Sequence, residues 1–165
     1  GGLIGLRNED VSGGEISVKR SVNIHLEETR GKNDNARRTI TLSLLAQSIL
    51  ADQRAMLAVR GIESPWVFPD EFGERTHPEA MLERWKTYGE QHGIDSTIHE
   101  MRHTFVSVNK ADMPIELLKS IVGHSVSMDT TGIYGHEVDG EGERAAKITD
   151  MVFNRILGID DQNGL

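Results

Sequence analysis

The sequence predicts an α+β fold that is mainly helical, with a small antiparallel β-sheet near the N-terminus. Apolar and polar residues alternate at two places in the first 42 residues, which is the pattern of half-buried strands. From Ser43 onward, apolar residues instead repeat every three or four positions, between residues that commonly begin and end helices. The chain has 165 residues, the size of one domain, and we treat residues 1–165 as a single domain.

The two strands are expected on either side of a polar stretch. Apolar residues alternate over positions 16–22, directly after the turn signal Gly13-Gly14. Positions 37–42, Arg-Arg-Thr-Ile-Thr-Leu, alternate again, whereas residues 23–35 between them show neither period. The two arms therefore predict a short antiparallel sheet.

Five helices follow in the prediction. Their expected ends are marked by an N-capping Ser43, by Pro78 and Pro114 at helix starts, and by glycines at helix ends. The helices are expected at about 43–60, 78–92, 98–108, 114–122 and 141–157. The spacing predicts that the following residues face the core: Leu45, Ile49, Met56 and Leu57 in the first helix, Leu82, Trp85 and Tyr88 in the second, Ile115 and Leu118 in the fourth, and Ala145, Ile148, Val152 and Ile156 in the fifth.

The composition limits the classes of partner and chemistry. A net charge of −8 is unusual for a free-standing nucleic-acid binder, but residues 61–80 and 135–165 each carry a net charge of −4, so the remainder is neutral. We therefore expect weak DNA affinity from this chain alone. The absence of cysteine excludes disulfides and thiol catalysis. With no apolar run of about 18 residues and no signal peptide, we expect a cytoplasmic protein without a membrane partner.

Candidate catalytic side chains are concentrated in the second half of the chain. Residues 98–105 read Ile-His-Glu-Met-Arg-His-Thr-Phe, which places His99 and Arg102 three residues apart on one helix face. Val-Gly-His follows and ends at His124, and Tyr134 stands ten residues further on. A covalent attack on a phosphodiester needs a nucleophile, cationic hydrogen-bond donors and an acid for the leaving oxygen. Two imidazoles, a guanidinium and a phenol can supply these parts without a metal.

This arrangement resembles the signature of the tyrosine recombinases, or phage integrase family: His-x-x-Arg, then Leu-Gly-His, then a nucleophilic tyrosine nine or ten residues later. Three further segments are similar to family patterns in the same order, at residues 3–11, 31–42 and 66–69. The second of these looks like the family's β-hairpin, which carries a catalytic lysine and aligns it with Lys32. The resemblance extends from about residue 3 to residue 136.

The resemblance implies site-specific DNA integration or excision by strand cleavage and rejoining through a 3′-phosphotyrosyl intermediate. It implies double-stranded DNA as the partner, with no small-molecule substrate, no metal and no cofactor. It also implies a homotetramer on DNA, exchange of a C-terminal segment at residues 139–165 and a bacterial or phage origin. The catalytic residues that it implies are Lys32, His99, Arg102, His124 and Tyr134.

One family feature does not align. The first catalytic arginine of the family lies in Gly-Leu-Arg-x-x-Glu, shortly before the segment that matches residues 3–11. Arg7 follows Gly-Leu, but the glutamate comes two residues later, not three, and its neighbours match the later, structural segment. We therefore expect a catalytic domain truncated before that arginine, with weak or no activity as a fragment.

Two alternatives compete with this interpretation. His99, Glu100 and His103 match the His-Glu-x-x-His motif of zinc peptidases, with Glu116 or His124 available as a third ligand. That interpretation leaves Lys32 and Tyr134 unexplained. The other alternative is an integrase-like DNA-binding remnant that no longer cleaves.

Overall fold

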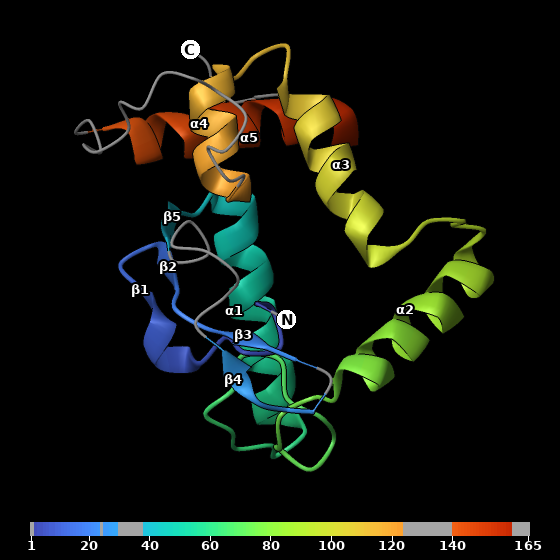
Figure 1. The fold of residues 1–165 in the computed structure, drawn as a ribbon. Coiled ribbons are helices and arrows are strands. Elements are labelled where there is room, and N and C mark those ends of the chain that lie inside the picture. The colour runs from blue at the N-terminus through green and yellow to red at the C-terminus, as the bar shows by residue number, and fades with distance from the viewer. Residues whose placement is uncertain (1, 24, 30–37, 124–139, 160–165) are drawn as a thin grey trace.

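The computed structural model describes residues 2–23, 25–29, 38–123 and 140–159. Its described part opens with a short 3-10 helix, η1 (Asn8–Asp10), followed by two small antiparallel sheets. The helices come after the sheets: α1 (Leu44–Val59), α2 (Pro78–His92), α3 (Ile98–Asn109), α4 (Ile115–Val122) and α5 (Glu141–Leu157). The predicted α+β class, mainly helical with a small sheet near the N-terminus, is confirmed (Figure 1).

The larger sheet contains three strands in the order β1 (Val11–Ser12), β2 (Glu15–Val18) and β5 (Arg38–Thr41). β1 and β2 are joined at Gly13 and Gly14, which both have positive φ, a conformation that glycine adopts without a Cβ clash. β2 and β5 then pair antiparallel, with Val18 opposite Arg38. The second predicted strand is therefore present, and it ends the sheet beside the start of α1.

The first predicted strand, at residues 16–22, is in fact divided. β2 ends at Val18, and β3 (Ser21–Val22) pairs with β4 (Glu28–Thr29) in a separate sheet. The break falls at Lys19 and Arg20, whose side chains both form ion pairs with the buried Asp10. These charged contacts depend on a residue outside the alternating pattern, so the pattern alone could not predict the break.

The helix ends follow the predicted caps. The Ser43 hydroxyl accepts a hydrogen bond from the backbone N–H of Ala46 at 3.2 Å, at the start of α1. Pro78 occupies the first turn of α2, where its missing N–H leaves no intrahelical bond unmade. Gly93 and Gly158 end α2 and α5 in the left-handed conformation that glycine favours.

The predicted buried faces were partly wrong. In α1, Leu50 is buried with Leu6 and Val67, whereas Ile49 is 54 % exposed. Tyr88, which we expected to pack in the core, is 48 % exposed, although its ring stacks on Trp85. The remaining predicted core positions that the structure exposes are Met56, Leu82, Ile115 and Ile156. Helical spacing identifies an apolar stripe, but the segments that cover it are distant in sequence.

In the part of the chain that the structure describes, buried apolar residues form two clusters. One joins Leu6, Leu50 and Val67 between the N-terminal segment, α1 and the strand-like residues after Pro65. The other joins α3, α4 and α5 through Met113, Leu117, Leu118 and Ala145, with Phe105, Val106, Ile121 and Ile148 packed against it. Of the described helices, none is both long enough and apolar enough to cross a bilayer.

α5 lies on the core of its own chain. Its Ala145 belongs to the cluster with α4, and Figure 1 shows α5 passing behind α4 beside α3. The Asp150 carboxylate accepts hydrogen bonds from the backbone N–H groups of Leu44 (2.7 Å) and Leu45 (3.1 Å) at the start of α1. The sequence allowed this helix to pack on a neighbour or on its own core, and exchange of the segment between chains stays a prediction.

Candidate functional site

The first turn of α3 is fixed by a reciprocal cap. The Thr97 hydroxyl accepts a hydrogen bond from the backbone N–H of Glu100 at 3.3 Å, and the Glu100 carboxylate accepts one from the Thr97 N–H at 2.6 Å. The hydrogen bond from the Thr97 backbone N–H to the carboxylate is the first cause of a lowered pKa for Glu100, and the Thr97 side chain lowers that pKa further. The carboxylate therefore faces back toward the helix start, and the direction of α3 is set by local sequence.

The zinc-peptidase interpretation needs a different use of these residues. The rings of His99 and His103 lie 5.0 Å apart between centroids, in an edge-to-face arrangement. Within the described part of the chain, no group of three histidine, aspartate or glutamate side chains is placed to hold a metal ion. His124, one of the two candidate third ligands, lies outside the described residues. Since Glu100 is used as a helix cap, the motif is explained by local helix structure.

Arg102 follows His99 by one helical turn and is half-buried, whereas His99 is exposed. Neither of the nearby acids, Asp95 and Glu100, forms an ion pair with Arg102, and no other carboxylate among the described residues does so. A half-buried guanidinium without a carboxylate has five N–H donors available for an anion. The geometry therefore fits a phosphate-binding arginine.

The second half of α3 anchors this arginine to the core. Phe105 and Val106 pack against the cluster shared by α4 and α5. Asn109 is fully buried and donates its side-chain N–H to the Phe105 carbonyl at 2.9 Å. The segment that carries His99 and Arg102 is thus capped at one end and packed at the other, so the backbone under both side chains is well defined.

Three of the five predicted catalytic residues, Lys32, His124 and Tyr134, lie outside the described residues. The structure therefore places only His99 and Arg102 of that set. The chain re-enters the described part at Arg38, six residues after Lys32, and α4 ends two residues before His124. The roles of Lys32, His124 and Tyr134 stay predictions.

Sequence reasoning did not single out Arg38, which lies beside Arg102. Arg38 begins β5, and its Nε–H donates to the Ile121 carbonyl at 2.8 Å, in the last turn of α4. Burial lowers the pKa of Arg38, and the nearby charge of Arg102 lowers it further. The sequence did contain one signal for this residue: Arg38 is a basic residue within an alternating strand, and no acid stands beside it in sequence.

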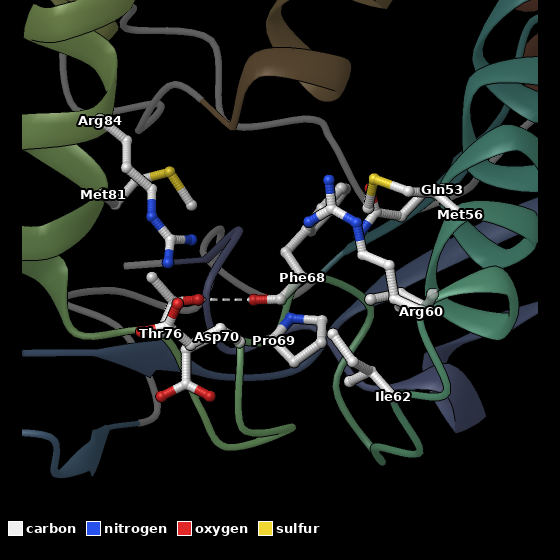
Figure 2. Close-up of a pocket in the computed structure, with 12 residues that line it drawn as sticks. Gln53, Met56, Arg60, Ile62, Phe68, Pro69, Asp70, Thr76, Met81 and Arg84 are labelled. Carbon is white, nitrogen blue, oxygen red and sulfur yellow. Dashed lines mark hydrogen bonds between the residues drawn. The ribbon is translucent and has the colours of Figure 1, made fainter.

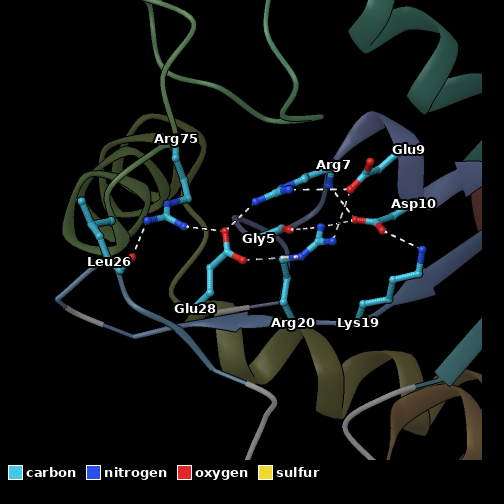
Figure 3. A network of polar contacts seen from close by, with 9 residues as sticks. All are labelled: Gly5, Arg7, Glu9, Asp10, Lys19, Arg20, Leu26, Glu28 and Arg75. Atoms are coloured by element: carbon cyan, nitrogen blue, oxygen red, sulfur yellow. Dashed lines mark hydrogen bonds and ion pairs between the residues drawn. The ribbon is translucent and has the colours of Figure 1, made fainter.

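Arg7, the residue that superficially matched the family's first arginine motif, is held by an acid and an aromatic ring of its own chain. Its guanidinium contacts Glu28 at 2.8 Å and lies 4.9 Å from the centre of the Trp66 ring. Arg75 reaches the same glutamate at 3.2 Å (Figure 3). Its guanidinium also lies 5.2 Å from the centre of the same ring. These contacts join the N-terminal segment to β4 and to residues 66–75. Arg7 therefore has a structural role, as its sequence neighbours indicated.

A separate hollow of about 450 Å³ lies between the end of α1, the start of α2 and the segment that joins them. Arg60 and Arg84 line it together with Asp70 and Glu71, and the Thr76 hydroxyl donates to the Phe68 carbonyl at its wall (Figure 2). Its lining has mixed charge and includes none of the predicted catalytic residues. The hollow is thus distinct from the site on α3.

A profile of the phage integrase family matches residues 3–141, which is most of the sequence. The chain therefore belongs to the phage integrase family, as the motifs indicated. Among curated relatives, the tyrosine recombinase XerA of Pyrococcus furiosus is 27 % identical over 133 residues, which cover 78 % of this chain and 45 % of that protein. The tyrosine recombinase XerA of Thermococcus kodakarensis is 29 % identical over 114 residues, 66 % of this chain and 40 % of that protein. The matches thus span less than half the length of both relatives.

Proposed function

We propose that this chain is the catalytic domain of a site-specific recombinase that cleaves and rejoins duplex DNA. The observation that carries the proposal is Arg102, a half-buried guanidinium with no carboxylate partner among the described residues, one turn from His99. Family membership supplies the class of reaction, and the names of both relatives support recombination. The proposed partner is double-stranded DNA, bound by a homotetramer in a cytoplasmic protein.

The proposed reaction is a transesterification. The Tyr134 phenolic oxygen attacks phosphorus, the bond from phosphorus to the 5′ oxygen breaks, and a 3′-phosphotyrosine forms. The departing 5′ oxygen takes a proton from Lys32 and becomes a hydroxyl. The reverse attack by a 5′-hydroxyl of another strand restores the DNA and releases the tyrosine. Because one phosphate ester replaces another at each step, neither nucleotide hydrolysis nor a redox partner is required.

The remaining side chains stabilise charge in this scheme. Arg102 donates two parallel hydrogen bonds to the non-bridging phosphate oxygens, where the transition state accumulates negative charge. His99 and His124 donate further hydrogen bonds or transfer the tyrosine proton. An unperturbed tyrosine has a pKa of about 10, so cations beside the phosphate also help the phenol to lose its proton at neutral pH.

The nucleophile can be tested with a duplex nicked beside the cleavage point, which traps a covalent intermediate. The longest native protein that contains this chain should form a covalent adduct through Tyr134, and Tyr134→Phe should abolish it. DNA binding should be almost unchanged, since only one hydroxyl is removed. Tyr88→Phe is the matched control and should react normally. An adduct that persists in Tyr134→Phe contradicts the assignment of the nucleophile.

The same substrate tests the phosphate contact. Arg102→Lys should lower the cleavage rate by roughly 10²–10³-fold, because an ammonium cannot form the fork of a guanidinium. His124→Ala should lower the rate less, since it removes a single donor. Specific DNA binding without any adduct in the unmodified protein would support a non-cleaving DNA-binding remnant.

A further inference from the structure

Arg38 and Arg102 form a pair of like charges with no counter-charge from the described part of the protein. Each comes from a different element, β5 for Arg38 and α3 for Arg102. Among the described residues, neither guanidinium has an ion-pair partner, although other arginines of the chain, such as Arg20 and Arg75, are paired with acids. Two neighbouring half-buried cations repel each other unless an anion lies between them.

The orientation of Arg38 is set by the backbone of another helix. Its Nε–H donates to the Ile121 carbonyl at 2.8 Å, and that carbonyl lies in the last turn of α4, where partial negative charge favours a cation. This bond occupies one of the five N–H donors and leaves the two terminal nitrogens available. α4 contacts both β5, which carries Arg38, and α3, which carries Arg102. In keeping with this arrangement, the nearby charge of Arg102 contributes to the lowered pKa of Arg38.

We infer that Arg38 is a second phosphate-binding residue, which shares with Arg102 the anion that the proposed reaction places there. The α4 carbonyl holds the guanidinium of Arg38 in place, and its terminal N–H groups donate to a non-bridging phosphate oxygen. The bound phosphate relieves the repulsion between the two arginines. Arg38 therefore strengthens binding of the phosphate in the ground state and stabilises the negative charge of the transition state. This inference rests on the proposed function for the identity of its phosphodiester ligand.

The first test measures anion binding by this chain without DNA. Inorganic phosphate, titrated at constant ionic strength, should shift the Nε–H resonance of Arg38 in nitrogen–proton NMR spectra. Arg38→Gln and Arg102→Gln should each weaken phosphate binding by about tenfold or more, the scale of one lost hydrogen bond to a charged group. Arg38→Lys should recover part of the affinity. Arg54→Gln removes the same charge from an exposed position of α1 and should bind like the unmodified chain.

These variants separate phosphate binding from a purely structural role of Arg38. All measurements are made below the melting temperature of each variant, with the fold verified by circular dichroism. If Arg38→Gln remains folded and binds phosphate as tightly as Arg54→Gln, the inference is wrong. If Arg38→Gln fails to fold, two other results decide. Unchanged phosphate affinity in Arg38→Lys, together with an unshifted Arg38 Nε–H resonance in the unmodified chain, would also overturn the inference.

The second test uses the nicked duplex with the longest native protein that contains this chain, and it separates this inference from the proposed function. Arg38→Gln should lower the single-turnover cleavage rate by about tenfold or more, whereas Arg54→Gln should not. Adduct formation at an unchanged rate in Arg38→Gln would overturn the role of Arg38 and leave the proposed recombinase intact. Phosphate binding that depends on Arg38, with no adduct through Tyr134, would instead leave the anion site intact and overturn the proposed reaction.

Discussion

Asp10 shows how a single buried charge organises the N-terminal part of the molecule. Its side chain is 1 % exposed, accepts the Arg7 backbone N–H at 3.0 Å and forms ion pairs with Arg20 and with Lys19 (Figure 3). Burial alone would raise the pKa of Asp10, but the Arg7 N–H and the two cations together lower it. The ionised form is thus favoured in the folded state. Asp10 therefore connects η1 to the segment between β2 and β3.

Removal of this charge should destabilise the fold. Asp10→Asn removes the charged partner of Lys19 and the closest of the three carboxylates around Arg20. We expect the free energy of unfolding to fall by about 2–3 kcal/mol, below the range for fully buried pairs because Lys19 is half exposed. Glu9→Gln is the matched control. Its carboxylate is 65 % exposed, so a change within about 0.5 kcal/mol is expected. Urea denaturation at pH 7 measures both, and equal effects of the two variants would contradict the role of Asp10.

The same pair of proteins has an expected pH dependence. The folded pKa of Asp10 lies below its ordinary value of 3.8, so its ionised form stabilises the fold above about pH 5. That contribution is lost as pH falls through the folded pKa. The difference in unfolding free energy between the unmodified chain and Asp10→Asn should therefore shrink below pH 4. A difference that grows toward low pH would contradict this assignment of the charge.

At the scale of elements, helix ends were predictable and buried faces were not. Ser43, Pro78 and Gly93 act on the backbone within a few residues, so their effect is visible in sequence. The burial of Leu50 in place of Ile49 depends on Leu6 and Val67, which come from distant segments. α2 shows the same limit, since neither core cluster includes one of its residues, and Tyr88 stays half exposed.

The candidate site also has one part that was predictable from local sequence and one part that was not. His99 and Arg102 were predictable because they belong to one contiguous motif on one helix face. The proximity of Arg38 to Arg102 was not, since it requires the pairing of β5 with β2 and a hydrogen bond to Ile121, 83 residues further along the chain. Such a contact between strand and helix ends has no local signature.

The contact between α5 and the start of α1 gives a test at this scale. Asp150 accepts two backbone N–H groups that α1 cannot satisfy internally, and its negative charge lies at the positive end of that helix. Asp150→Asn should lower the free energy of unfolding by about 1–2 kcal/mol, because one acceptor oxygen and the charge are lost. Glu143→Gln changes an exposed acid of the same helix and should have little effect. Thermal unfolding followed by circular dichroism distinguishes them.

For the whole molecule, the decisive feature is that α5 closes the core that also holds the candidate site. Ala145 packs with Met113, Leu117 and Leu118, and that cluster supports the half of α3 next to Arg102. An exchanged α5 in an assembled tetramer would have to make these contacts with a neighbouring chain. Packing within one chain and exchange between chains therefore predict different dependences on protein concentration.

We expect the isolated chain to keep α5 on its own core. Its melting temperature should then be independent of protein concentration, since unfolding of a monomer involves no dissociation, whereas an exchanged assembly melts at higher temperature as concentration rises. Val152 is 1 % exposed and Met151 is 46 % exposed on the same helix, so Val152→Asp should abolish cooperative unfolding while Met151→Asp should retain it. Differential scanning calorimetry over a hundredfold range of concentration measures both effects. Two results together would show that α5 pairs chains together in solution. The melting temperature of the unmodified chain would rise with protein concentration, and that of Met151→Asp would be lower and nearly constant.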